Sequence, residues 1–202
     1  MIWQPFALDY AAMLKKTDMP LALTALRAIL GPVIVLLALY YPSHIGFGLC
    51  LVIAFLSDVF DGIIARRLNV ATPNLRRLDS LADTIFYVGA LFAAFNLHKD
   101  IILDHRGSLV LLAVLEVTRY VFDLYKFGRE ASYHMWTSKL WGICLFYGFM
   151  ALLIFDQAGP VTLAIYIGIV SDLEGLLISL VLKEWKSDVP TIFHAVQLNR
   201  SA

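Results

Sequence analysis

Apolar stretches long enough to cross a bilayer are the feature that most limits how this chain can fold. Residues 28–57 form a run of 30 residues without a single Asp, Glu, Lys or Arg, whereas a spanning helix needs about 20 mostly apolar residues. Hydrophobic residues make up 60% of the 202 residues, the mean hydropathy is +0.75, and only 16% of the chain is charged. Because soluble domains are about a quarter charged, the composition predicts an integral membrane protein.

The charge balance and the cysteines exclude other classes. The chain has 16 basic and 16 acidic residues and no net charge, which gives no support to a nucleic-acid partner. Its two cysteines, Cys50 and Cys144, lie within apolar stretches. We expect them to be free and to serve as packing residues, and not to form a disulfide framework.

Turn-forming residues and charges divide the apolar sequence into six predicted spans. Tyr41-Pro42-Ser43-His44 interrupts the longest run, so we expect a helical hairpin there. The fourth span carries Glu116, Arg119 and Asp123, and the sixth carries Asp172 and Glu174, so both place charged side chains inside the bundle. The predicted fold is an all-α integral membrane bundle with spans at 21–41, 45–65, 81–97, 108–125, 136–155 and 161–182.

The N-terminal residues are not typical of a signal peptide, because Lys15 and Lys16 follow the apolar residues and Asp9 interrupts them. Apolar side chains recur here at helical spacing, which predicts an amphipathic helix lying in the headgroup layer. A helix packed on a soluble partner is the alternative. The predicted organisation is an amphipathic helix at 1–18, a six-span domain at 19–186 and a cytosolic tail at 187–202.

Lys and Arg are concentrated on one side of the predicted bundle. They occur at both termini and in the second and fourth loops, whereas the first and fifth loops contain none. Because cytoplasmic loops are enriched in these residues, both termini and the loop at 66–77 are expected to face the cytosol. In a bacterium this would be the inner membrane.

Four aspartates at the ends of the second and third spans carry the strongest chemical signal. Asp58 and Asp61 are three residues apart, and Asp79 and Asp83 are four apart, so each pair shares a helix face. A short loop can bring the two pairs together. Four converging carboxylates would repel one another unless cations lay between them, and such oxygen ligands suit Mg²⁺ or Mn²⁺. The alternative is a set of interfacial salt bridges between these aspartates and the neighbouring arginines.

The residues around these aspartates suit the binding of a diphosphate. Gly62 and Ala65 leave room for a ligand or another helix, and Arg66, about one turn after Asp61, is placed to reach a phosphate oxygen. Metal ions so placed could hold a diphosphate, and a spare carboxylate could take a proton from an attacking hydroxyl.

This stretch resembles the CDP-alcohol phosphatidyltransferases, whose pattern is D-x2-D-G-x2-A-R-x8-G-x3-D-x3-D. Seven fixed positions match with every spacing kept: Asp58, Asp61, Gly62, Ala65, Arg66, Asp79 and Asp83. The residues Pro20-Leu21-Ala22-Leu23-Thr24-Ala25-Leu26-Arg27 are similar to the opening of that family's first span, Pro-Asn-x-x-Thr-x-x-Arg. The family's plan, an interfacial helix followed by six spans, covers nearly the whole chain.

The resemblance implies a reaction in which an alcohol hydroxyl displaces CMP from a CDP-linked substrate. By this resemblance Asp58, Asp61 and Asp79 ligate two divalent ions, and Asp83 is both a ligand and the general base. Positions that line the CDP group in the family correspond to Thr24, Gly62, Ala65, Arg66 and Thr72. The resemblance also implies a homodimer whose active site opens to the cytosol.

The chain departs from the family pattern at several positions. Leu75 replaces the second glycine, Leu21 replaces the usual Asn, and Thr84 and Leu115 stand where phosphatidylglycerophosphate-synthase-like members have Lys and Arg. Leu75 would lie beside the nucleotide and could narrow its pocket. The last two changes leave less support for the phosphate of a phosphorylated acceptor.

Candidates for binding the acceptor alcohol are Glu116, Arg119 and Lys139. Glu116 and Arg119 are three residues apart, so they either neutralise each other inside the bundle or contact the acceptor. Lys139 lies in a segment that resembles one near the family's substrate cleft, and its alternative is a lysine that snorkels to the interface.

The sequence therefore predicts a membrane transferase of phospholipid synthesis that uses CDP-diacylglycerol, a small polar alcohol and two divalent ions, Mg²⁺ or Mn²⁺. Within the same class, a soluble CDP-alcohol donor with diacylglycerol as acceptor remains open. So do two other functions: a catalytically impaired relative that binds CDP-lipid, motivated by Leu75, and a cation-binding transporter. Against the transporter, residues 45–57 and 84–97 carry no acid or base to line a path across the bilayer.

Overall fold

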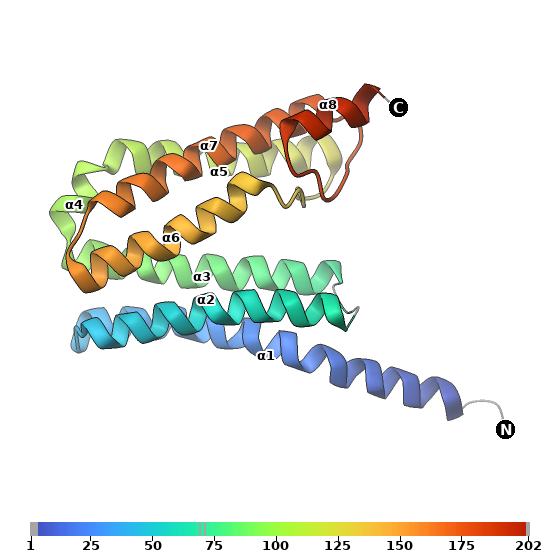
Figure 1. The fold of residues 1–202 in the computed structure, drawn as a ribbon, viewed down its shortest axis with the longest axis horizontal. Helices are drawn as coiled ribbons and strands as arrows, with labels where there is room; N and C mark the ends of the chain where they lie inside the picture. The colour runs from blue at the N-terminus through green and yellow to red at the C-terminus, as the bar shows by residue number, and fades with distance from the viewer. Residues whose placement is uncertain (1–3, 69, 71, 201–202) are drawn as a thin grey trace. The chain divides into compact units, whose positions relative to one another are not determined.

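The computed structural model describes residues 4–68, 70 and 72–200, and it gives the side chains of these residues except for 4–18, 73, 76 and 200. Every regular element in the described part of the chain is a helix. In chain order the helices are α1 (Gln4–Tyr40), α2 (His44–Arg67), α3 (Pro73–Leu97), α4 (Lys99–Asp104), α5 (Arg106–Phe127), α6 (Trp136–Phe155), α7 (Gly159–Val181) and α8 (Ile192–Arg200) (Figure 1).

Helices of membrane-spanning length occur at all six predicted positions. Among the described residues, five of these helices are apolar enough to cross a membrane. They are the part of α1 at Met19–Tyr40, the whole of α2, the part of α3 at Arg77–Leu97, and the whole of α6 and of α7. The protein is therefore an integral membrane protein. Helix α5 is long enough to span a membrane, but it carries Glu116, Arg119 and Asp123 and is not among the helices that are apolar enough to do so. The count of six spans stays a prediction.

The predicted N-terminal helix is not a separate element, because α1 runs without a break from Gln4 to Tyr40. It contains Pro20 and Pro32, and although proline removes one backbone hydrogen bond, neighbouring helices can compensate for this inside a membrane. The side chains of residues 4–18 lie outside the described set. Their amphipathic face and their place in the headgroup layer stay predictions.

The predicted break at residues 41–44 is confirmed. Helix α1 ends at Tyr40, and α2 begins at His44. Ser43 caps α2, since its side-chain oxygen accepts a hydrogen bond from the backbone N–H of Gly46 at 3.3 Å. Such a cap satisfies one of the N–H groups that the first turn of a helix leaves without a partner.

The chain divides into two compact units, Met1–Leu97 and His98–Ala202. In the first unit α1 packs against both α2 and α3 (Figure 1). Its interior is formed by buried apolar side chains such as Ile34, Phe47, Leu51 and Phe86, together with the fully buried Ala90, Ala93 and Ala94 of α3. Small residues of this kind let helix backbones approach closely in a membrane.

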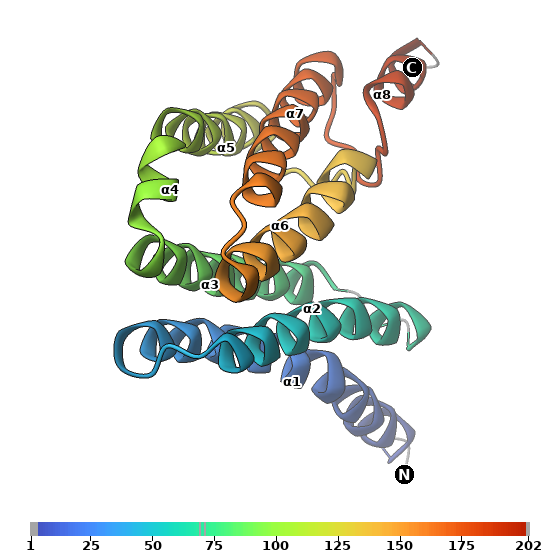
Figure 2. The ribbon, with the colours of Figure 1, turned by 60° about the vertical axis from the view of Figure 1, so that its left-hand side comes forward.

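In the second unit α7 packs against α5, α6 and α8 (Figure 2). The predicted cytosolic tail is residues 187–202, and its described part, residues 187–200, includes α8 and packs against the loop that follows α5. The backbone N–H of Asp188 donates to the carbonyl of Ser132 at 2.9 Å, and Val189 and Ala195 are fully buried in a cluster with Met135 and Ile178. The side of the membrane on which this segment lies is a prediction.

Two glycines lie where the backbones of α1 and α3 approach each other closely. A Cβ atom placed on Gly89 of α3 would lie 2.6 Å from the backbone carbonyl oxygen of Gly31 in α1. A Cβ atom on Gly31 would lie 2.8 Å from the carbonyl oxygen of Ile85. Both contacts are with backbone, which cannot move aside as a flexible side chain can. The crossing of α1 and α3 therefore requires glycine at both positions.

We predict that Gly89→Ala lowers the stability of the protein by about 1–3 kcal/mol, the usual cost of overpacking a well-packed interior. Gly142→Ala in α6 is the matched control, because nothing lies within 4 Å of a Cβ atom there. Thermal unfolding in nanodiscs, followed by circular dichroism, should show a lower Tm for Gly89→Ala and an unchanged or raised Tm for Gly142→Ala. Equal Tm values for Gly89→Ala and the wild type would contradict the crossing.

Candidate active site

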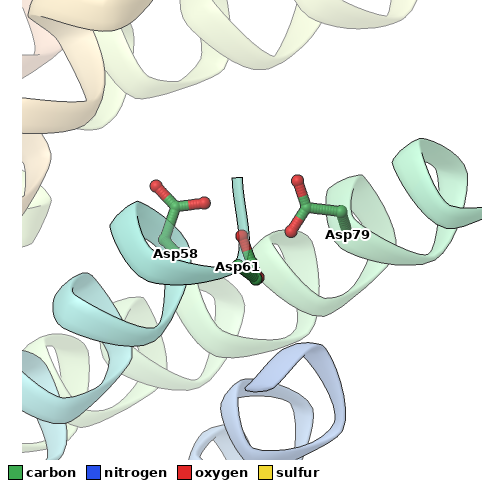
Figure 3. Close-up of side chains that lie close together, drawn as sticks. All are labelled: Asp58, Asp61 and Asp79. Atoms are coloured by element: carbon green, nitrogen blue, oxygen red, sulfur yellow. The ribbon is translucent and has the colours of Figure 1, made fainter. Parts of the chain in front are cut away.

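The two predicted aspartate pairs come together in the first unit. Asp58 and Asp61 lie three residues apart on α2, and Asp79 and Asp83 lie four apart on α3, so each helix presents its pair on one face. Carboxylate oxygens of Asp58, Asp61 and Asp79 lie within 4.8 Å of one another. Figure 3 shows these three side chains pointing toward a common space between the two helices.

A single arginine from α1 joins all four carboxylates. Nη1 of Arg27 pairs with Asp58 of α2 and Asp83 of α3, and Nη2 pairs with Asp61 of α2 and Asp79 of α3. The distances to Asp58 and Asp79 are both 2.7 Å. Each terminal nitrogen of the guanidinium thus links one carboxylate of α2 to one carboxylate of α3.

The site is deep on the arginine side and open on the other. The side chain of Arg27 is 1% exposed and that of Asp61 is 5% exposed, whereas those of Asp58, Asp79 and Asp83 are 46%, 35% and 37% exposed. A ligand can therefore reach three of the four carboxylates without any unfolding of the unit.

The donor set of this site fits hard divalent cations. Four carboxylates and one guanidinium carry a formal charge of −3 (−4 from the aspartates and +1 from Arg27). Arg27 contacts one oxygen of each carboxylate, which leaves a second oxygen on each. An excess of negative charge on oxygen ligands is what Mg²⁺ and Mn²⁺ sites provide.

The residues predicted to line a nucleotide lie around the same aspartates. Thr24 is buried, and its hydroxyl oxygen lies 3.0 Å from the carbonyl oxygen of Pro20 and 3.4 Å from Oδ2 of Asp61, two acceptors for its one proton. The guanidinium of the exposed Arg66 lies alongside Gly62, because a Cβ atom there would be 3.4 Å from Nη1 of Arg66. Ala65, one residue before Arg66, is buried.

Thr72 has a structural role that the sequence pattern did not indicate. It directly precedes α3, and its side-chain oxygen accepts a hydrogen bond from the backbone N–H of Leu75 at 3.2 Å. With Pro73 as the first helical residue, this is the geometry of a helix N-cap. The Thr72 hydroxyl and the family-atypical Leu75 therefore belong to the same turn.

The three residues predicted to bind the acceptor all lie in the second unit. Arg119 pairs with Glu116 at 2.9 Å, so the predicted mutual neutralisation is present. Arg119 also lies 3.5 Å from Asp172 of α7, whose side chain is 1% exposed and whose two oxygens have no hydrogen-bond partner in the described residues. Lys139 lies over the ring of Trp136, 4.6 Å from its centroid, which is a cation–π contact.

Arg27 is a residue of the aspartate site that the sequence analysis did not assign to it. Arg27 entered that analysis only as the last residue of the family-like opening of the first span. The sequence feature that could have identified it is its position inside the first predicted span, because a charged residue in a membrane span requires a partner of opposite charge. The sequence analysis named Asp172 as a charge in the sixth span for the same reason, but the position of a charge along the chain does not indicate which partner the fold supplies.

Comparison with known proteins identifies one family. The family model for CDP-alcohol phosphatidyltransferases matches residues 17–179, which include all four aspartates, Arg27 and most of the second unit. Searches of curated proteins and of solved structures found no significant match. The family transfers phosphatidyl groups from CDP-alcohols and uses divalent metal ions. Because the match covers more than half of the sequence, the chain belongs to the CDP-alcohol phosphatidyltransferase family.

Proposed function

We propose that the protein is an enzyme of phospholipid synthesis that transfers a phosphatidyl group from CDP-diacylglycerol to a small polar alcohol and releases CMP. The observation that carries the proposal is the meeting of four carboxylates from α2 and α3 at a membrane-span end, with a formal charge of −3 and three of the carboxylates open to a ligand. A purely structural cluster would be expected to balance its charges more closely, because uncompensated charge inside a membrane is costly.

Asp58, Asp61, Asp79 and Asp83 are the proposed ligands of two divalent ions, Mg²⁺ or Mn²⁺. When bound, such ions supply positive charge that offsets the charge of the diphosphate in the transition state. Thr24, Gly62, Ala65, Arg66 and Thr72 are proposed to line the cytidine diphosphate group. The exposed guanidinium of Arg66 suits a phosphate oxygen, and the absence of a side chain at Gly62 leaves the space in which this guanidinium lies.

The reaction forms one phosphorus–oxygen bond and breaks another. The hydroxyl oxygen of the acceptor attacks the phosphorus atom of the phosphatidyl group. The bond from that phosphorus to the bridging oxygen breaks, and its electron pair leaves with CMP. Asp83 accepts the hydroxyl proton as general base, a role for which its 37% exposed carboxylate is open to a substrate.

Glu116, Arg119 and Lys139 are the proposed contacts of the acceptor alcohol. Arg119 and Lys139 are positively charged and suit a phosphate or hydroxyl group, and Glu116 suits a hydroxyl donor. The ion pair of Glu116 with Arg119 is the competing role for these two residues. The proposed assembly is a homodimer, as the family resemblance implies. The distribution of Lys and Arg supports termini and an active site that face the cytosol, at the inner membrane in a bacterium.

Asp83→Asn is expected to lower CMP release by at least about 10²-fold, because general bases contribute typically 10²–10⁴-fold to rate. The measurement is CMP release from CDP-diacylglycerol by the protein in nanodiscs with Mg²⁺ or Mn²⁺, and with glycerol-3-phosphate, inositol, inositol phosphate or serine as acceptor. Asp104→Asn, which removes an exposed carboxylate from α4, is the matched control and should retain wild-type activity. Equal rates for Asp83→Asn and the wild type would rule out the proposed base.

A second donor must be tested in the same assay, because a soluble CDP-alcohol with diacylglycerol as acceptor also yields CMP. Consumption of that donor in place of CDP-diacylglycerol would overturn the proposed donor and keep the reaction class. Absence of CMP with every pair would overturn the proposed activity of the natural chain. If Leu75→Gly then released CMP, the chain would be a relative that is impaired at this position.

Thr72→Val is expected to lower the stability by about 0.5–2 kcal/mol, the usual cost of losing an N-cap, and Thr72→Ser should stay close to the wild type. Thermal unfolding in nanodiscs measures this effect, and titration with CDP measures nucleotide binding in the same variants. If Thr72→Val weakens CDP binding while its Tm is unchanged, the hydroxyl serves the nucleotide and not the cap.

A further inference from the structure

The position of Arg27 suggests a role that neither the family pattern nor the proposed reaction assigns. Its side chain is 1% exposed, so it is not available to a substrate from the open side of the site. Its two terminal nitrogens reach four carboxylates that come from two helices and lie 31 to 56 residues further along the chain. A residue in this position acts through the aspartates and not on the reacting atoms.

The fork of the guanidinium determines what these contacts can do. Nη1 joins Asp58 to Asp83, and Nη2 joins Asp61 to Asp79, so each nitrogen holds a carboxylate of α2 beside a carboxylate of α3. Arg presents its donors in a rigid planar fork, whereas Lys presents a single ammonium on a flexible stem. One ammonium cannot hold two separate carboxylate pairs in the same way.

Arg27 also leaves the carboxylates able to bind something else. It contacts one oxygen of each aspartate, and the side chains of Asp58, Asp79 and Asp83 are each more than a third exposed. Its single positive charge offsets one of four negative charges. The site is thus held in place while most of its negative charge is kept.

We propose that Arg27 is the positioning residue of the aspartate site, and that its forked contacts set the α2 and α3 carboxylates in register for divalent cations. This inference rests on the proposed function, because it concerns the cations that the aspartates would bind. Groups that hold metal ligands in place typically contribute 10–100-fold to metal affinity. Arg27 stays in contact with the aspartates when the cations are bound.

The test is Mn²⁺ affinity, measured by electron paramagnetic resonance on the full chain in nanodiscs, for the wild type and for Arg27→Lys. The variant keeps the positive charge and removes the fork, so we expect its Mn²⁺ affinity to fall by about 10–100-fold. Arg67→Lys is the matched control, since it makes the same change at an exposed position, at the end of α2 that carries Asp61. This variant should bind Mn²⁺ as the wild type does. Unchanged or tighter binding in Arg27→Lys would overturn the proposal, because tighter binding would make Arg27 a competitor of the cation.

A second measurement avoids any dependence on how well the variant folds. In wild-type protein labelled with ¹⁵N-arginine, electron–nuclear double resonance should detect an arginine nitrogen close to bound Mn²⁺. The signal should persist in Arg66→Lys, which removes the exposed arginine that lies alongside Gly62. Loss of the signal in Arg66→Lys, or its absence from the wild type, would mean that Arg27 leaves when the cation binds, and would overturn the proposal.

CMP release by the wild type in the same preparation separates the two proposals. Release of CMP with unchanged Mn²⁺ affinity in Arg27→Lys would overturn the role of Arg27 alone. Weakened Mn²⁺ binding in Arg27→Lys without CMP release by the wild type would overturn the enzymatic proposal alone. If the wild type neither bound Mn²⁺ nor released CMP with Mg²⁺ or Mn²⁺, both proposals would fail.

Discussion

The burial of one positive charge among four negative charges is the interaction on which the first unit depends. Arg27 lies in a membrane span with 1% of its side chain exposed, and a buried charge that loses its partner costs about 3–5 kcal/mol. The same cost applies to the deeply placed Asp61. Each charge therefore needs the other helices in place, and the ion pairs tie α1 to α2 and α3 at one point.

The glycine crossing of α1 and α3 is what allows these ion pairs to form. Gly31 follows Arg27 by one helical turn, and its carbonyl approaches Gly89 of α3 so closely that a Cβ atom could not fit. Further along the same pair of helices, the side-chain amide of Asn96 donates to the carbonyl of Ala38 at 3.1 Å. Close backbone packing thus sets the depth at which Arg27 meets Asp79 and Asp83.

Much of this arrangement could be predicted from local sequence. The break at 41–44 predicted where α1 ends and where α2 begins. The spacing of three or four residues on a helix predicted that each aspartate pair shares a face. These features depend on residues close together in the chain. The ion pair of Glu116 with Arg119 was predictable for the same reason.

The remaining features depend on contacts between distant helices, and local pattern does not determine these. The partners of Arg27 and the pairing of Arg119 with Asp172 arise from tertiary packing. The cap formed by Thr72 was hidden because the family pattern had already given that residue another role. The status of α5 as a span also depends on tertiary packing, since its acidic and basic residues must be satisfied by neighbouring helices.

The separation of Arg27 from its partners along the chain has a consequence for how the protein is made. The first span leaves the ribosome with Arg27 unpaired, and its partners follow 31 residues later on α2 and 52 to 56 residues later on α3. The three-residue connection at 41–43 lets α1 and α2 enter the bilayer as a hairpin, in which Asp58 and Asp61 are the first carboxylates to reach Arg27. Integration of the first span is therefore completed by later ones, and a ribosome stalled before α3 would leave a hairpin with only half of its ion pairs.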